Sequence, residues 1–154
     1  MFPKMRRSKA EMNIEDTISL LTRCDEGVLG TIGINGYPHT TPINYVYYNK
    51  KIYMHSAKEG YKLRNIENND KVSFTVYDGI YIDEEKFTTK YQSAIAYGIA
   101  KIIPGNKEIL MELIKKYSKS FAAEGLEYVN KSFDTTFLIE ITIDHITGKI
   151  RKKI

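Results

Sequence analysis

The chain has 154 residues, a hydrophobic fraction of 42%, a charged fraction of 27% and a formal net charge of +4. This length and composition are typical of one globular domain, so we expect residues 1–154 to form a single domain. A single cysteine, Cys24, excludes an intramolecular disulfide framework, and the apolar runs are too short for a membrane-spanning helix. Since the basic N-terminal residues lack the apolar core of a signal peptide, we expect a cytoplasmic protein without a membrane partner.

Much of the positive charge lies at the two ends of the chain. The basic residues there are Lys4, Arg6, Arg7 and Lys9 at the start, and Lys149, Arg151, Lys152 and Lys153 at the finish. Solvated tails and a terminal segment that closes over an anionic ligand both fit this pattern. A nucleic-acid surface would need a basic face with base-stacking or groove-reading groups beside it. The sequence contains no such motif, so we expect no nucleic-acid partner.

The first half of the chain predicts a helix, three strands and a second helix. The ranges are 13–24 for the first helix, 27–34, 37–48 and 52–55 for the strands, and 59–68 for the second helix. Asn13 is the predicted N-cap of the first helix. Asn35–Gly36 is typical of a type I′ hairpin turn, and Asn49–Lys50 makes a second tight turn.

The second half predicts two strands, a helix and a last strand. The ranges are 71–77 and 89–103 for the strands, 106–120 for the helix, 121–132 for a less regular segment, and 135–143 for the last strand. Apolar and polar residues alternate cleanly in 71–77, which is typical of a half-buried strand. Because hairpin turns join the early strands, we expect a mainly β fold with α decorations, in which about six antiparallel strands close into a small barrel.

The strand–turn–helix over 52–66 is the segment that most suggests chemistry. His55 and Ser56 end the strand, Gly60 lies in the turn, and Lys62 lies in the first helical turn. A helix N-terminus with a hydroxyl and a lysine beside it forms a plausible phosphate site. His55 is either a structural histidine or an imidazole that presents a proton to a bound ring.

The strand over 37–48 is unusual because it contains Pro42. Proline cannot donate to a β ladder, so this strand must lie at an edge or be bulged there. Asn44 adds an amide with donor and acceptor capacity. No pair of His, Cys or carboxylate residues has metal-ligand spacing, so we expect no metal site. The glycine-rich nucleotide motifs and the GxSxG and HExxH motifs are also missing.

Several short motifs, in this order, resemble a known family. They are Arg6-Arg7, Gly36-Tyr37-Pro38 with Pro42-Ile43-Asn44-Tyr45, Ile52 to Ala57 with Gly60 and Lys62, Tyr91-Gln92-Ser93 with Gly98, and Thr147-Gly148-Lys149. Together they resemble the FMN-binding split-barrel flavoproteins. Within these, they are most similar to the pyridoxamine 5′-phosphate oxidase-related branch that includes the nitroimidazole-resistance proteins.

The resemblance implies a six-stranded antiparallel split β-barrel, a homodimer, and FMN bound at the subunit interface. The residues that it assigns to the cofactor are Pro42, Ile43 and Asn44 beside the ring, His55 and Ala57 at its border, Ser56 and Lys62 at the phosphate, and Gln92 and Ser93 from the neighbouring strand or the other subunit. His55 matches the proposed active-site histidine of the nitroimidazole-resistance relatives. The extra basic groups of a true pyridoxamine-phosphate oxidase are not identifiable.

These expectations lead to a functional hypothesis. The protein would be an FMN-dependent oxidoreductase that takes electrons from a nicotinamide or other cellular donor. It would pass them to a small planar acceptor, such as a nitroaromatic of the 5-nitroimidazole type, with His55 as the catalytic residue. Two alternatives remain open: a flavin-binding module without turnover, and a haem- or deazaflavin-binding relative on the same fold.

Overall fold

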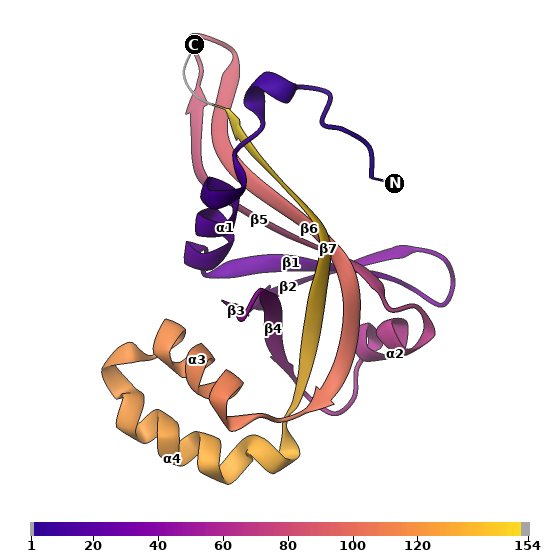
Figure 1. The fold of residues 1–154 in the computed structure, drawn as a ribbon, viewed down its shortest axis with the longest axis vertical. Coiled ribbons are helices and arrows are strands. Elements are labelled where there is room, and N and C mark those ends of the chain that lie inside the picture. The colour runs from indigo at the N-terminus through magenta and orange to yellow at the C-terminus, as the bar shows by residue number, and fades with distance from the viewer. Residues whose placement is uncertain (1, 152–154) are drawn as a thin grey trace.

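One curled antiparallel sheet is the framework of the molecule (Figure 1). The computed structural model describes residues 2–151, which contribute seven strands in the order β2-β1-β5-β6-β7-β4-β3. The strands are β1 (Glu26–Ile32), β2 (Pro38–Asn44), β3 (Val46–Tyr48), β4 (Lys51–Ser56), β5 (Lys71–Asp83), β6 (Thr88–Pro104) and β7 (Phe137–Arg151). The sheet forms a half-barrel, which confirms the predicted mainly β split barrel, with seven strands rather than six.

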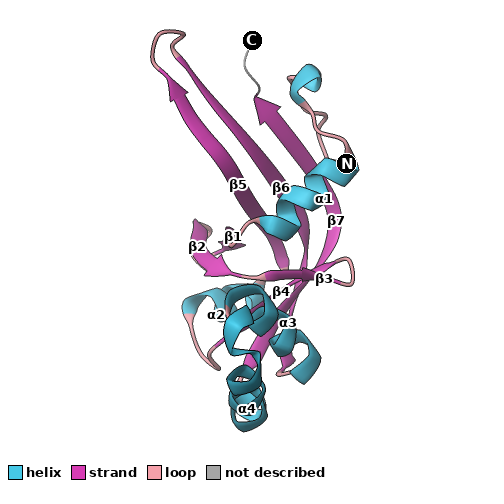
Figure 2. Ribbon diagram, turned by 90° about the vertical axis from the view of Figure 1, so that its left-hand side faces the viewer, coloured by secondary structure: helices cyan, strands magenta, loops and turns pink. Residues whose placement is uncertain are grey.

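Four helices pack around this sheet within the described residues. They are α1 (Ile14–Arg23), α2 (Tyr61–Asn68), α3 (Lys107–Tyr117) and α4 (Ala122–Ser132), with short 3₁₀ turns η1 (Ser8–Ala10), η2 (Lys119–Phe121) and η3 (Phe133–Thr135). Figure 2 shows α1 against the long strands β5, β6 and β7, and the α3–α4 pair at the opposite end of the molecule. None of the helices in the described part of the chain is long and apolar enough to span a membrane.

The seventh strand arises because the predicted strand over 37–48 is interrupted at Tyr45. β2 pairs with β1, whereas β3 pairs with β4 at the opposite edge of the sheet, so the chain changes edge at this residue. The Tyr45 side chain is completely buried and its hydroxyl donates to the carbonyl oxygen of Leu21. Its backbone N–H donates to the hydroxyl of Tyr117 at 2.8 Å. The single long strand was therefore a wrong prediction, because this burial draws the backbone away from β1.

The hairpin between β1 and β2 also differs from the type I′ prediction. Only Gly36 has a positive φ there, at 82°, whereas Asn49 and Lys50 both have positive φ, at 48° and 62°. The Asn35 carboxamide accepts a hydrogen bond from the N–H of Tyr37 at 3.2 Å, which stabilises a longer turn. The two-residue I′ geometry therefore occurs at Asn49–Lys50, where two left-handed residues join β3 to β4.

Helix α4 occupies the segment that was predicted to be irregular. Gly125, near its centre, lowers the helix propensity of this sequence. In the structure, however, a Cβ atom at Gly125 would lie 2.4 Å from Cγ2 of Ile114 on α3. The glycine therefore allows α4 to pack closely on α3, and tertiary packing outweighs the local propensity.

Two hydrophobic cores lie on the two faces of the sheet among the described residues. The first fills the barrel and includes Leu29, Tyr45, Met54, Phe74 and Ile141. The second lies under α3 and α4 and includes Val46, Tyr53, Leu113, Val129 and Leu138. Strand β4 contributes to both cores because successive side chains of a strand point to opposite faces.

Candidate functional site

The end of β4 places its last two side chains on opposite faces of the sheet. His55 is exposed on the face that α3 and α4 cover, whereas Ser56 points into the barrel with 4% of its surface exposed. The Ser56 hydroxyl has no hydrogen-bond partner among the described residues. Since buried polar groups are nearly always paired, an unpaired hydroxyl at this position needs a ligand or a solvent partner.

Helix α2 begins directly after this strand end. Gly60 is its N-cap, with φ at 153°, and no side chain of the described residues caps the helix. The first N–H groups of a helix lack partners inside the helix, so this end of α2 can accept an anion. Lys62 lies half-buried in the first turn, and Ala57 is exposed in the connection. The arrangement suits a phosphate group.

Residues Pro42, Ile43 and Asn44 form the last part of β2. The strand lies at an edge of the sheet, which confirms the prediction for a strand that contains Pro42. Pro42 and Asn44 are exposed on one face, while the side chain of Ile43 packs against the barrel core. The exposed edge leaves backbone groups available to a ligand, since an edge strand has no neighbour on one side.

A cavity of about 340 Å³ brings Asn44 and His55 together. The two residues reach it from the ends of β2 and β4, which are far apart in the sequence. The remaining wall comes mainly from the helices, with Leu113, Ile114, Tyr117, Tyr128 and Val129. The amide and the imidazole therefore face an otherwise largely apolar space.

Pro42 lines a second cavity of about 720 Å³, together with Arg23 and Asp78. Arg23 donates to the Gln92 carboxamide oxygen at 2.9 Å and forms an ion pair with Asp78 at 3.2 Å. Gln92 therefore lies beside this second cavity. Ser93 lies half-buried in β6 on the opposite face from Gln92. Within one chain, Gln92 and Ser93 are not part of the cavity that holds Asn44 and His55.

A hydrogen-bonded junction links α3 to Tyr45, between β2 and β3, and to Cys24 and Asp25, between α1 and β1. The Tyr117 hydroxyl donates to the carbonyl of Tyr45 at 2.7 Å and also contacts the carbonyl of Asp25. Burial raises the pKa of Tyr117, although the Tyr45 backbone and the Asn44 amide oppose this shift. Lys116 donates to the carbonyl of Cys24 at 2.6 Å, and its burial lowers the pKa of its ammonium group. These bonds fix α3 relative to Asn44.

Sequence reasoning missed the contribution of the helices to the site. The helical spacing of α3 includes Tyr117, but nothing in the sequence pairs it with Tyr45. Tyr128 and Val129 belong to α4, which was not predicted as a helix. No group of three or more metal-ligating side chains occurs in residues 2–151.

The basic N-terminal segment lies along the end of β7. The backbone N–H of Met12 donates to the carbonyl of Gly148 at 2.9 Å. Arg6, Arg7 and Arg151 line a shared cavity of about 890 Å³ there. The two ends of the chain therefore meet in one basic region, although Lys152 and Lys153 lie outside the described residues.

Comparisons with known proteins agree with this architecture. A protein from Bacteroides thetaiotaomicron, described as a proposed 5-nitroimidazole antibiotic resistance protein, superposes with a TM-score of 0.73 at 21% identity, over 91% of this chain and 86% of that one. A conserved hypothetical protein from Mycobacterium tuberculosis has a TM-score of 0.82 at 17% identity, over 98% and 97%. The FAD- and haem-binding protein from Mycobacterium smegmatis has a TM-score of 0.72 at 16% identity, over 92% and 72%.

Because the sequence identities are low, these structural likenesses establish only the fold. No curated protein sequence matches the chain. The sequence model of the pyridoxamine 5′-phosphate oxidase family, in contrast, matches residues 14–150, from the start of α1 nearly to the end of β7. The chain is therefore a member of the pyridoxamine 5′-phosphate oxidase-like family.

Proposed function

We propose that this protein is an FMN-dependent oxidoreductase that reduces a small planar acceptor, such as a nitroaromatic compound. The observation that carries the proposal is the convergence of Asn44 and His55 on one cavity, with Ser56 and the uncapped start of α2 following His55 in the chain. One face of this strand end suits a phosphate, and the other faces the cavity beside which the flavin ring would lie. FAD binding by the M. smegmatis relative supports a flavin on this fold.

The residues present fit the phosphate of FMN. The unpaired Ser56 hydroxyl would donate to a phosphate oxygen, and Lys62 would supply a charge-assisted hydrogen bond. Bonds to a charged group contribute about 1.5–3 kcal/mol each, and the α2 terminus adds roughly 0.3–1 kcal/mol. One phosphate would satisfy all three groups, which supports the proposal of a mononucleotide.

The edge of β2 fits the flavin ring. Pro42, Ile43 and Asn44 would offer backbone groups and one amide, while His55 and Ala57 would border the ring. Bound FMN would supply the electron transfer between a nicotinamide donor and the acceptor. His55 would orient the acceptor and exchange a proton with it, and the apolar walls from α3 and α4 would exclude water.

A homodimer is part of the proposal because Gln92 and Ser93 lie apart from the cavity of Asn44 and His55 in one chain. The outer face of the sheet carries small or apolar, half-buried side chains, including Val28, Gly30 and Ile95. Such a face suits association with a second copy. In a dimer, Gln92 and Ser93 of one protomer would complete the flavin site of its partner.

The absorption spectrum of the purified protein tests the cofactor. We expect the two visible bands of an oxidised flavin, or their appearance after FMN is added, with saturable binding in a titration. A protein that stays colourless and takes up no FMN would contradict the proposal. A Soret band would instead favour the haem-binding alternative.

The reaction is tested by anaerobic reduction of the FMN-loaded protein with a nicotinamide donor, followed by addition of a nitroaromatic acceptor. We expect His55→Gln to retain FMN and its reduced flavin to be oxidised by the acceptor more than tenfold more slowly, since a positioned acid or base contributes about 10²–10⁴ in rate. Flavin that no donor reduces would identify a binding module without turnover.

A further inference from the structure

The cavity beneath α3 and α4 has a chemical character that narrows the class of acceptor. Its described lining contains no Asp, Glu, Lys or Arg side chain. Leu110, Leu113 and Val129 supply buried apolar surface, and Tyr128 forms an exposed part of the wall, with 67% of its surface accessible. A charged ligand would lose its hydration there without gaining an opposite charge.

Three of the five hydroxyl groups that line this cavity donate hydrogen bonds to the protein backbone. Ser132 donates to the carbonyl of Tyr128 at 2.8 Å, and Thr136 donates to the carbonyl of Ser132 at 2.9 Å. The Tyr117 hydroxyl is bonded to the backbone of Tyr45. A ligand therefore meets the side chains of Asn44 and His55 at the sheet end of the cavity, and the hydroxyls of Ser118 and Tyr128 elsewhere in its wall.

Specific contacts hold the walls of this cavity in place. Hydrogen bonds from Tyr117 and Lys116 hold α3 to the connections at Tyr45 and Cys24, and Gly125 lets α4 approach Ile114 closely. Leu113 and Val129 belong to the same buried core, which fixes the two helices to the sheet. Binding therefore requires little reorganisation, which favours affinity.

The volume of the cavity indicates the size of its ligand. At about 340 Å³ it lies at the lower end of the range for small-molecule sites, about 300–1,000 Å³. It is roughly twice the ~150 Å³ of an engineered apolar cavity that binds benzene. This space accommodates a molecule of one or two rings.

We propose that this cavity is the acceptor pocket, and that it selects an uncharged, planar molecule of one or two rings whose polar substituent faces Asn44 and His55. The assignment rests on the proposed oxidoreductase function. Residues of α3 and α4, which are not among the predicted flavin contacts, then determine specificity. Leu113, Ile114 and Val129 contact the apolar part of the acceptor, and Tyr128 borders its entrance.

Binding of two matched probes tests the pocket. Calorimetric titrations use the neutral 4-nitrobenzyl alcohol and the anionic 4-nitrobenzoate, each with the FMN-loaded and with the FMN-free protein. We expect the neutral probe to bind at least tenfold more tightly than the anion. Equal affinities, or tighter binding of the anion, would overturn the proposal.

A bulky residue introduced into the cavity provides the structural test. Ser132→Phe should weaken binding of the neutral probe at least tenfold while it changes the FMN dissociation constant less than twofold. Ser120→Phe, at an exposed position on η2, is the matched control and should change neither. Ser118→Phe enters the same cavity from the end of α3 and replaces Ser132→Phe if that variant does not fold.

The outcomes separate this proposal from the proposed function. Unchanged probe affinity in a folded Ser132→Phe variant, or a loss of FMN affinity in that variant, would overturn the acceptor pocket. A wild-type protein that binds no FMN would contradict the oxidoreductase proposal instead. Probe binding to the FMN-free protein then still decides whether the cavity is a ligand site.

Discussion

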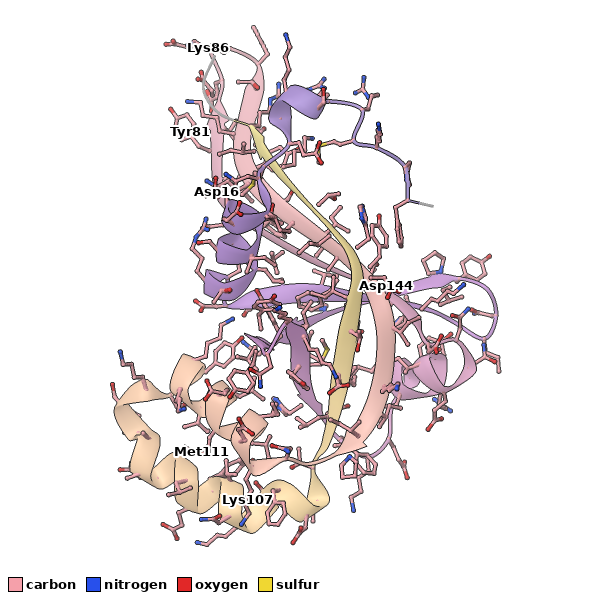
Figure 3. The ribbon with its side chains drawn as sticks, in the orientation of Figure 1. Asp16, Tyr81, Lys86, Lys107, Met111 and Asp144 are labelled. Carbon is pink, nitrogen blue, oxygen red and sulfur yellow. The ribbon has the colours of Figure 1, made fainter. Side chains whose placement is uncertain are left out.

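The two ends of the sheet differ in how completely their apolar side chains are buried within a single chain. At one end, α3 and α4 cover β3, β4 and the start of β7, and Tyr53, Leu113 and Leu138 are buried there. At the other end, the β5–β6 hairpin extends as an arm, and Ile82 and Phe87 expose 67% and 97% of their surfaces. Figure 3 shows Tyr81 and Lys86 on this arm, far from Lys107 and Met111 on α3.

The candidate site residues divide in the same way. Asn44 and His55 belong to the well-packed end, whereas Gln92 and Ser93 lie on the strands of the arm. A large exposed apolar surface usually marks an interaction site. The arm therefore lacks a core of its own and suits contact with a second protomer, which would also bring Gln92 to a flavin.

The largest expected effect is the loss of stability when the buried side chain of Tyr45 is removed. Tyr45→Ala should lower the free energy of unfolding by about 3–5 kcal/mol, because it leaves a cavity where the chain changes edge. Tyr45→Phe, which keeps the ring, should cost about 1–2 kcal/mol for the lost bond to Leu21. Denaturant unfolding followed by circular dichroism measures both, and equal losses would contradict the packing argument.

Removal of the lysine at the start of α2 should have the next largest effect. Lys62→Ala should weaken FMN binding about ten- to a hundredfold, since a charge-assisted bond contributes about 1.5–3 kcal/mol. Lys131→Ala is the charge-matched control, because within residues 2–151 Lys131 forms only an exposed pair with Glu127 on α4. Fluorescence titration of FMN measures the effect, and identical affinities for the two variants would refute the phosphate assignment.

Charged substitutions on the arm test dimer formation separately from the folding of the protomer. The double variant Ile82→Asp/Phe87→Asp should raise the dimer dissociation constant about tenfold and weaken FMN binding in parallel. The stability of the protomer should change by less than about 0.5 kcal/mol, since both side chains are exposed. Ile34→Asp, at an exposed turn residue, is the control, and analytical ultracentrifugation measures the association. A monomeric wild-type protein that binds FMN would contradict this role of the arm.

The smallest effect is expected for Glu140 in β7. Burial raises the pKa of its carboxyl, but hydrogen bonds from Lys51 and Tyr53 outweigh burial and lower the pKa overall. A lowered folded-state pKa adds stability above the unfolded value of about 4.3, and this stability disappears as the pH falls through the folded value. Glu140→Gln should therefore cost about 0.2–1 kcal/mol at pH 7, and progressively less as the pH falls below the unfolded value. A loss that is independent of pH would point to packing instead.

Local patterns predicted the elements that depend on local interactions. Asn13 caps α1, its side chain accepting from the N–H of Asp16 at 2.7 Å, and the alternation of Val72, Phe74 and Val76 gives the buried face of β5. Pro42 predicted an edge strand or a bulge, and its strand lies at an edge. These features follow from capping, periodicity and backbone chemistry, each of which involves few residues.

The features that escaped prediction depend on contacts between distant segments. The change of edge at Tyr45 requires Leu21 and Tyr117, and α4 requires Ile114 to pack against Gly125. The cavity that joins Asn44 to His55 exists only once α3 is fixed to the sheet. No pattern within β2, β4 or α3 alone carries this information, because tertiary packing determines it.

The opposite directions of His55 and Ser56 make the length of β4 a constraint on evolution. A deletion of one residue between the Asn49–Lys50 turn and the strand end would reverse every later side chain of the strand. The imidazole would then enter the barrel, and the hydroxyl would face α3 and α4. When homologous sequences are compared with this chain, insertions and deletions should therefore accumulate in the β1–β2 and β5–β6 turns. The segment from the β3–β4 turn to Gly60 should keep a fixed length.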